Sequence, residues 1–223
     1  MRLAVVRHAE SVENADKYNG FYQHPRPWAA AAAHALSRDV IGLTARGFRQ
    51  TAWLNETLPQ VVGEQPAVFV SQYRRARDTA ELALPAIQAE VTGLLNEQHY
   101  GDATYMTMRE LFDTFPDGAD DRRHRKHLWT PPGEGGESLA VEVHGRVTAF
   151  LTLLSSGAVE AGRNVVAFTH HTAILGLRAV LEQRPVTEVV EESRARKLPN
   201  AAVLVYQAAA GGYELQQVIE PPA

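Results

Sequence analysis

The 223-residue chain contains no cysteine, and this absence excludes several kinds of site at once. Without a thiol, the protein can form no disulfide, no thiolate zinc site, no iron–sulfur cluster and no cysteine nucleophile. Long apolar runs are missing as well. The first run, Leu3–Val6, is too short for a signal peptide, and no stretch approaches the length of a membrane span. We therefore expect a cytoplasmic protein without a membrane partner.

An excess of positive charge is also absent. The chain has 22 Lys and Arg residues against 26 Asp and Glu residues, a formal net charge of -4 at pH 7. A chain of this charge does not attract nucleic acid as a whole, so we expect no nucleic-acid partner. No Gly-x-Gly-x-x-Gly motif follows the first apolar run, which argues against a nucleotide-binding Rossmann protein. A cationic site would have to be a local feature.

Three short apolar runs of the buried-strand type each lead into basic residues and then into a helical pattern. If these runs are neighbouring parallel strands, their carboxyl ends share one edge of a sheet, where open α/β sheets bind their ligands. Arginines and histidines gathered at that edge would form a pocket for a doubly charged anion. The runs and the residues that follow them are Leu3–Val6 with Arg7-His8, Ala67–Val70 with Ser71 and Arg74-Arg75, and Val165–Phe168 with Thr169-His170-His171.

The alternation of strand-like runs with longer helical patterns predicts an α/β fold with a largely parallel sheet. A helix is expected to begin after Thr44, which can cap it, and to stop before Pro59. The stretch 101–136 is rich in turn residues and shows no clear period. Neither a repeat nor a linker interrupts the chain, so residues 1–223 are expected to form one domain. Further helices are predicted over 74–83, 138–154 and 171–181, and a closing hairpin over 201–206 and 213–219.

Short motifs occur in a fixed order along most of the chain. The first is Arg7-His8-Ala9-Glu10-Ser11 with Asn14. This ordered set resembles the histidine phosphatase (phosphoglycerate mutase-like) superfamily, in particular its phosphatase branch, whose first motif is Arg-His-Gly-x-Ser/Thr-x-x-Asn. The resemblance implies a three-layer α/β sandwich with a mostly parallel central sheet and helices on both faces. The other matching residues are Leu43-Thr44-Ala45-Arg46-Gly47 with Gln50, then Ser71, Arg75, Ala76, Thr79 and Ala80, then Leu95-Asn96-Glu97, Gly136-Glu137-Ser138-Leu139, Arg146 and His170.

The resemblance implies catalysis through a phosphohistidine. Neutral His8 would attack phosphorus and form a covalent intermediate, with its other ring nitrogen donating to a backbone carbonyl. Arginine carries a fork of donors matched to phosphate oxygens, so Arg7 and Arg75 would hold the phosphoryl group together with protonated His170. Two arginines and two histidines can supply the charge that a metal ion supplies elsewhere, and we expect neither a metal nor another cofactor. The further phosphate- or substrate-binding residues that the resemblance implies are Ser11, Asn14 and Asn19.

The resemblance makes Glu97, the last residue of the matching segment Leu95-Asn96-Glu97, the candidate general acid. It would protonate the leaving alkoxide and then act as a base toward the hydrolytic water. A bound dianion raises the pKa of a neighbouring carboxyl group through like charge, which suits an acid. Without the surrounding motifs, a carboxylate in such a loop would more often be solvated.

Residues of about 98–135 are expected to form a lid over the site. This stretch holds the basic run 122–126, which three aspartates precede. A mixed run of this kind is as often a solvated face as a binding element. In the functional interpretation, Arg122 and Arg123 grip a carboxylate or a second phosphate of the substrate. His124 and His127 have no carboxylate partners in the pattern, so a surface position is favoured over a metal site.

A metal-independent phosphatase acting on phosphate monoesters of small metabolites is the favoured function, and its partner would be a phosphorylated small molecule. Met108 falls where the mutases have a substrate-gripping lysine, and the path from Glu97 to Gly136 is too short for the longer mutase insertion. A cofactor-dependent phosphoglycerate mutase stays open, because residues 95–101 are similar to the mutase segment. A non-catalytic phosphate-binding protein also stays open, although retention of His8 and its partner residues argues against it. The sequence leaves a homo-oligomer open as well.

Two positions depart from the family pattern. Ala9 replaces the usual glycine, so the backbone there is expected to approach the phosphate less closely. His171 stands where glycine or alanine is commoner, and it either lines the pocket or begins the following helix. The second of these roles is favoured.

Overall fold

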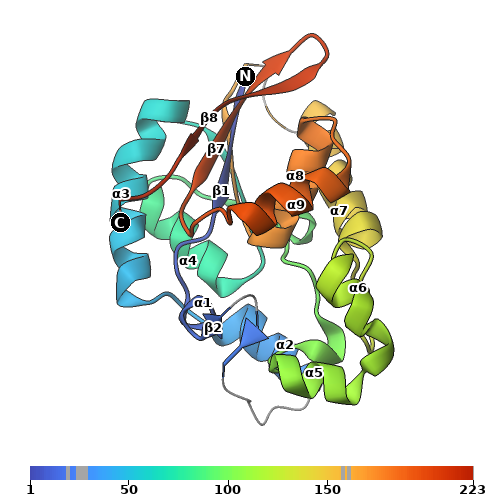
Figure 1. Ribbon diagram of the computed structural model, residues 1–223. Coiled ribbons are helices and arrows are strands. Elements are labelled where there is room, and N and C mark those ends of the chain that lie inside the picture. Colours follow the sequence, from blue (N-terminus) through green and yellow to red (C-terminus); the bar gives the residue numbers. More distant parts are fainter. Residues whose placement is uncertain (19–20, 24–29, 157–158, 160–161, 223) are drawn as a thin grey trace.

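The centre of the molecule is a six-stranded sheet (Figure 1). The structure, a computed structural model, describes all residues except 19–20, 24–29, 157–158, 160–161 and 223. In spatial order the strands are β5 (Glu90–Thr92), β4 (Ala67–Ser71), β6 (Val165–Thr169), β1 (Arg2–Arg7), β7 (Val203–Ala209) and β8 (Gly212–Ile219).

The three apolar runs form neighbouring parallel strands, as the sequence predicts. β6 lies between β4 and β1, with Val165 opposite both Ala67 and Leu3. The carboxyl ends of the strands therefore share one edge, where Arg7 lies opposite Thr169. The predicted closing hairpin is also present, because β7 pairs antiparallel with both β1 and β8.

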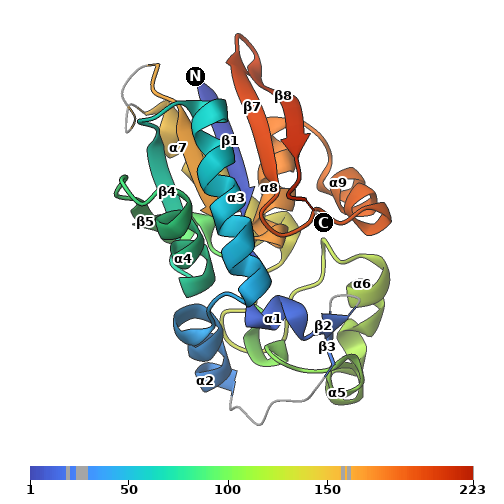
Figure 2. The same ribbon diagram turned by 90° about the vertical axis from the view of Figure 1, so that its left-hand side faces the viewer.

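Alternate residues of each strand face opposite sides of the sheet, and helices cover both sides. Leu3 and Val5 of β1 pack into one core cluster, whereas Ala4 and Val6 pack into the other. Figure 2 shows α3 in front of the sheet and α8 behind it, which is the expected three-layer α/β sandwich. One side carries α3 (Ala45–Val62) and α4 (Arg74–Ala83), and the other carries α7 (His144–Ser155), α8 (His171–Leu181) and α9 (Val186–Ala195).

Helix α3 begins where the sequence predicts but ends later. Thr44 caps it, accepting a hydrogen bond from the backbone N–H of Gly47 at 3.1 Å. The helix then continues through Pro59 to Val62, because a proline in the last turn removes only one backbone hydrogen bond. The residues after Pro59 gain burial in return, since Val61 and Val62 are only 7% and 3% exposed.

Short elements extend the molecule beyond the carboxyl edge of the sheet (Figures 1 and 2). Helices α5 and α6 have seven and six residues, too few for a period to show in the sequence. A small core of Ala103, Leu111 and Trp129 holds this region together. Its elements are α1 (Val12–Ala15), β2 (Lys17–Tyr18), β3 (Phe21–Tyr22), α2 (Ala30–Ala35), the π-helical turn Leu36–Val40, the 3-10 turns Gly101–Ala103 and Pro116–Gly118, α5 (Met108–Thr114) and α6 (Ala119–His124).

Two further turns support the main helices. The 3-10 turn Gly93–Leu95 follows β5, and a π-helical turn, Leu139–Val143, leads into α7 with Ser138 as its N-cap. Helix α9 was not predicted from the sequence. Within the described part of the chain, no helix has both the length and the apolar character needed to cross a bilayer.

Candidate active site

His8 follows the last residue of β1 and is 3% exposed. Its Nδ1 lies 2.7 Å from the carbonyl oxygen of Ala9, which can only accept, so Nδ1 carries the proton. The other nitrogen, Nε2, accepts a hydrogen bond from Nε of Arg75 at 3.2 Å. Burial and the charges of Arg75 and Arg7 hold the pKa of His8 well below its usual range. The imidazole is therefore neutral near pH 7, with the lone pair of Nε2 directed at the cationic side of the pocket.

Arg75 is anchored by a buried carboxylate that the sequence analysis did not identify. Its Nη1 lies 3.4 Å from Oε2 of Glu13, and the two side chains are 5% and 4% exposed. Nη1 also donates to the carbonyl of Ser37 at 2.9 Å, and the guanidinium lies 4.6 Å from the ring centroid of Tyr73. Burial lowers the pKa of Arg75, but Glu13 and Tyr73 outweigh it, so the pKa is raised overall. Arg75 is a fixed positive charge.

The carboxylate of Glu13 balances the positive charge of Arg75 and Lys17 in this part of the pocket. The hydroxyl of Tyr105 donates to its Oε1. Burial raises the pKa of Glu13, but Arg75 and Lys17 outweigh this effect and lower the pKa overall, so the carboxylate stays charged. Glu13 occupies a position that the family motif leaves free, which explains why motif matching did not find it.

Arg7 ends β1 and points into the same region. Its Nη1 donates to the carbonyl of Leu198, while its Nε is buried without a hydrogen-bond partner among the described residues. Burial lowers the pKa of Arg7 to about 10, against the opposing effect of Glu97. Arg7 thus remains charged at neutral pH and keeps a donor available for an anion.

Asn14 lines the pocket with its amide group, and Ser11 holds it there. Oδ1 of Asn14 accepts hydrogen bonds from the backbone N–H of Ser11 at 3.1 Å and from Nδ2 of Asn200 at 2.9 Å. The hydroxyl of Ser11 also donates to Oδ1, at 3.1 Å. Ser11 is fully buried and lines neither cavity described below, so the structure places it behind Asn14 rather than against a ligand. Asn19, also expected to bind substrate, lies outside the described residues.

His170 lies beside His8, with 5.0 Å between the ring centroids. Its Nε2 is 2.8 Å from Oγ of Ser71, while Nδ1 is buried without a partner among the described residues. Burial, Arg75 and His8 together hold the pKa of His170 well below its usual range. The sequence analysis expected a protonated ring; the structure favours a neutral one, which a neighbouring dianion would shift toward protonation.

Glu97 is held at the first turn of α8. Its Oε1 accepts from the backbone N–H of Thr172 at 3.1 Å and from that of Gln98 at 3.0 Å. Arg146 donates to the carbonyl of Asn96 at 3.1 Å and pairs with Glu137 at 2.8 Å. Motif residues far from the nucleophile thus position the backbone that carries Glu97.

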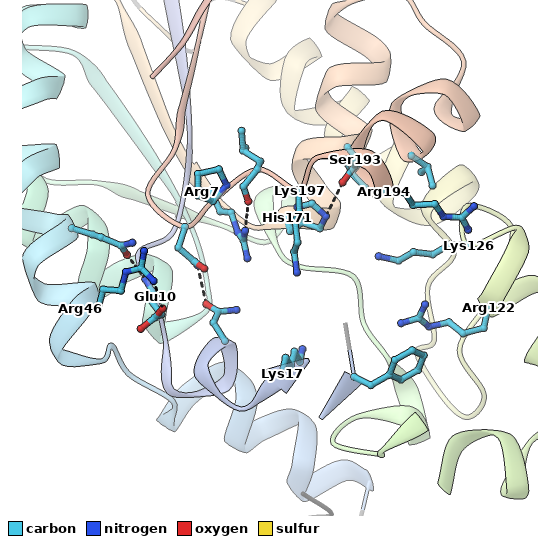
Figure 3. Close-up of a pocket in the computed structure, with 18 of the residues that line it drawn as sticks. Arg7, Glu10, Lys17, Arg46, Arg122, Lys126, His171, Ser193, Arg194 and Lys197 are labelled. Carbon is cyan, nitrogen blue, oxygen red and sulfur yellow. Dashed lines mark hydrogen bonds and ion pairs between the residues drawn. The ribbon is translucent and has the colours of Figure 1, made fainter. Parts of the chain in front are cut away.

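Two connected cavities contain these groups. The inner one, about 70 Å³, is lined by His8, Arg75 and Glu97, whereas His170 lies behind its wall. The outer one, about 710 Å³, opens beyond it (Figure 3). Several residues line both cavities, so the two lie next to each other. The shared residues are Arg7, Asn14, Lys17, Phe21 and Arg122.

The basic run of the expected lid divides between the pocket and solvent. Arg122 lines both cavities, with its guanidinium 4.4 Å from the ring centroid of Phe21 and 5.1 Å from that of Trp129. Arg123 lines the outer cavity and stacks on Phe112 at 4.1 Å. Arg125 instead pairs with aspartates on the exposed side.

His171 takes both of the roles considered in the sequence analysis, beginning a helix and lining the pocket. It is the first residue of α8, and it also lines the outer cavity. The sequence analysis did not single out Lys17, Lys126 and Lys197 as site residues, although they line the same cavities. None of the three lysines belongs to a matching motif, and only the folded chain brings them to the same cavities. In the part of the chain that the structure describes, no group of three or more metal-ligating side chains is assembled.

Comparisons with known proteins agree with this geometry. The family model "Histidine phosphatase superfamily (branch 1)" matches residues 3–220. An acid phosphatase of Mycobacterium tuberculosis is 28% identical over 205 residues, which cover 91% of this chain and 84% of that protein. A putative α-ribazole-5'-P phosphatase from Escherichia coli superposes with a TM-score of 0.73 at 22% identity, covering 97% and 94% of the two chains. A mycobacterial glucosyl-3-phosphoglycerate phosphatase superposes with a TM-score of 0.69 at 24% identity, covering 96% of each chain.

Proposed function

The chain belongs to the histidine phosphatase superfamily, and on that premise we propose that it is a metal-independent phosphatase acting on phosphate monoesters of small metabolites. The observation that carries the proposal is the state of His8. Its Nδ1 proton is committed to the carbonyl of Ala9, and its Nε2 lone pair faces Arg75. A neutral, fixed imidazole beside two buried arginines is suited to attack phosphorus.

In the first step, Nε2 of His8 attacks phosphorus, and the bond from phosphorus to the ester oxygen breaks. Arg7 and Arg75 hold the phosphoryl oxygens and stabilise their charge in the transition state. Glu97 gives its proton to the departing alkoxide, which leaves as an alcohol. The products are a phosphohistidine on His8 and a Glu97 carboxylate.

In the second step, water attacks the phosphohistidine. Glu97 now takes a proton from that water, and the bond between Nε2 of His8 and phosphorus breaks. Inorganic phosphate leaves, and both side chains return to their starting states. Arg7 and Arg75 keep the phosphoryl group in place through both steps, so no metal ion is needed to supply positive charge.

The outer cavity supports a small metabolite as the substrate. At about 710 Å³ it falls within the usual range of small-molecule sites, and Arg122, Arg123 and Lys126 of the stretch expected to form a lid line it. The side chains of Phe21 and Tyr100 offer apolar surface near the reacting centre. The similarity to an acid phosphatase supports the proposal of a phosphatase.

A chelator-treated screen of phosphorylated metabolites tests this function. We expect phosphate release from monoesters in the presence of excess EDTA, and rapid acid quenching should trap phosphate on His8. The screen should include 3-phosphoglycerate with and without 2,3-bisphosphoglycerate. Isomerisation faster than phosphate release would overturn the phosphatase in favour of a mutase. Phosphate binding without any turnover would show a non-catalytic protein.

A further inference from the structure

A segment from the C-terminal part of the chain, residues 198–202, lies against the residues that carry the proposed chemistry. It connects α9 to β7 and passes the carboxyl end of β1 (Figures 1 and 2). Three of its residues line the outer cavity, among them Asn200. The matching motifs end at His170, so nothing in the sequence pattern assigns a role to this segment. Its role has to be inferred from its contacts.

Backbone hydrogen bonds attach the segment to the residues at the end of β1. The N–H of Ala201 lies 3.1 Å from the carbonyl oxygen of Arg7 and 3.2 Å from that of His8, and it donates to both. In return, the N–H of Arg7 donates to the carbonyl of Ala202 at 3.0 Å. Ala201 is fully buried with a φ of 63°, a left-handed conformation that persists only where the surrounding structure enforces it. The segment therefore has a fixed position relative to His8.

The side chain of Asn200 joins His8 to Asn14. Its Nδ2 lies 3.0 Å from the carbonyl oxygen of His8 and 2.9 Å from Oδ1 of Asn14. A backbone carbonyl can only accept a hydrogen bond, so the carbonyl of His8 fixes which end of the Asn200 amide is the donor. The two hydrogens of Nδ2 then serve these two oxygens, and Oδ1 of Asn14 receives one of them.

The amide of Asn14 is oriented by two segments that are remote in sequence. The backbone N–H of Ser11, which can only donate, lies 3.1 Å from Oδ1, and Asn200 donates to the same oxygen. The other end of the amide, Nδ2, is left to donate elsewhere and has no partner among the described residues. Asn14 lines both cavities. An amide turned the other way would present an oxygen, and not a donor, to a bound anion.

We propose that Asn200 is a positioning residue, which holds the amide of Asn14 with Nδ2 directed at the phosphoryl group. The inference rests on the proposed phosphatase function, with Asn14 as a ligand of the phosphoryl group as the family resemblance implies. Asn200 lines the outer cavity but not the inner one that contains His8, so it acts through Asn14 and not on the phosphoryl group itself.

A titration with inorganic phosphate, followed by NMR of the asparagine side-chain amides, tests the proposal. Labelling with ¹⁵N gives a signal for Nδ2 of Asn14, which is identified by its loss in Asn14→Ala. In the native chain this signal should shift as phosphate binds. In Asn200→Ala the shift should be much smaller, and the Kd for phosphate should rise about tenfold. Either an unchanged shift or an unchanged Kd would overturn the proposal.

A double substitution shows whether Asn200 acts through Asn14. Asn14→Ala should also raise the Kd for phosphate about tenfold. The double variant Asn14→Ala/Asn200→Ala should raise it by about the same factor, because no amide remains to be positioned. A roughly hundredfold rise in the double variant would show two independent effects and overturn the proposal. If Asn200→Ala does not fold, Asn200→Ser, whose side chain is too short to reach both oxygens, replaces it with the same expectations.

Asn164 provides a matched control at the opposite edge of the sheet, where it precedes β6. Its Oδ1 accepts from the backbone N–H of Arg2 at 2.7 Å, and its Nδ2 donates to the carbonyl of Val62 at 3.0 Å. Like Asn200, it is half-buried and joins remote segments, but it lines neither cavity. Asn164→Ala should leave the Kd for phosphate and the signal of Asn14 unchanged. The same loss in this control would attribute the effect to a general loosening of the fold and overturn the proposal.

Phosphate binding needs no turnover, so the positioning role and the proposed function fail in different ways. A protein that hydrolyses no ester, but whose phosphate affinity and Asn14 signal depend on Asn200, would disprove the phosphatase and uphold the positioning role. Hydrolysis of esters with a phosphate affinity that does not depend on Asn200 would uphold the phosphatase and disprove the positioning role.

Discussion

Arg75 in the inner cavity and the lysines of the outer cavity differ in whether a carboxylate balances their positive charge. In the inner cavity, Arg75 has a buried counterion 3.4 Å away in Glu13, and its geometry is set before any ligand arrives. In the outer cavity, Lys126 and Lys197 have no such counterion among the described residues. The comparison shows that internal pairing sets the position of Arg75 before any ligand binds, whereas no carboxylate among the described residues sets the positions of Lys126 and Lys197.

Removing His8, the proposed nucleophile, is the strongest test of the inner cavity. His8→Ala should lower kcat by at least about 10⁴-fold, because it removes the nitrogen that is proposed to attack phosphorus. Steady-state hydrolysis of several esters provides the measurement. His124→Ala, an exposed histidine on α6, serves as the control and should retain full activity. Substantial hydrolysis by His8→Ala would remove the nucleophile assignment.

Glu13→Gln removes the ion pair between Glu13 and Arg75 in the inner cavity. It leaves Arg75 buried without its counterion, so the free energy of unfolding should fall by about 3 kcal/mol or more. Turnover should also fall, because Arg75 then loses the contact that orients it toward His8. Urea denaturation gives the first value and kinetics the second. In Arg196–Glu220, an exposed pair, Glu220→Gln should cost about 1 kcal/mol at most.

Substitution of Glu97, the proposed general acid, should affect esters with poor leaving groups more than esters with good ones. Glu97→Gln should slow the hydrolysis of alkyl phosphates by about 10²-fold, since a poor leaving group needs a proton. Aryl phosphates leave without protonation and should be affected much less. The measurement is the ratio of kcat/KM for the two ester classes. If both classes lose activity to the same degree, Glu97 is not the acid.

Stability should fall in mild acid because of three buried or half-buried histidines in and beside the cavities, His8, His170 and His171. The pKa values of His8, His170 and His171 lie well below those of the unfolded chain, near 6.5. Below pH 6.5 the unfolded state therefore binds protons that the folded state does not. The free energy of unfolding then falls with decreasing pH, by up to about 1.4 kcal/mol per pH unit for each imidazole.

His171→Gln isolates the contribution of the outer-cavity histidine to the pH dependence of the free energy of unfolding. Urea unfolding in a phosphate-free buffer between pH 7 and pH 5 should give a slope shallower by up to about 1.4 kcal/mol per pH unit than in the native chain. Added phosphate should reduce the difference, because an anion favours the protonated ring. An unchanged slope would show that His171 is already free to protonate in the folded protein.

Several features of the fold could be predicted because they depend on neighbours along the chain. The three buried strands are short apolar runs, and their parallel order follows from the alternation with helices. Helices α5 and α6 could not be predicted, since pieces of six or seven residues show no period. Helix α3 runs past Pro59 because burial of the residues after it outweighs one lost hydrogen bond.

The candidate site likewise contains residues that the sequence predicted and residues that only the structure shows. The motifs identified His8, Arg75 and Glu97, and the structure brings all three to the inner cavity. Glu13 was missed because its partner, Arg75, is remote in sequence. Ser11 was expected to contact a ligand, but its hydroxyl supports Asn14 instead. A side chain's direction depends on contacts that no motif records.

By itself, the sequence determined that thiol chemistry is absent and that three apolar runs lead into basic residues, and its motifs pointed to His8 as the candidate nucleophile. These properties are carried by residue type and local spacing. Only the tertiary structure decided that the pKa of His170 lies well below its usual range, and that Lys126 and Lys197 face one cavity without a counterion among the described residues. Burial and charge balance arise between residues far apart in the chain, and folding alone sets the distances that govern them.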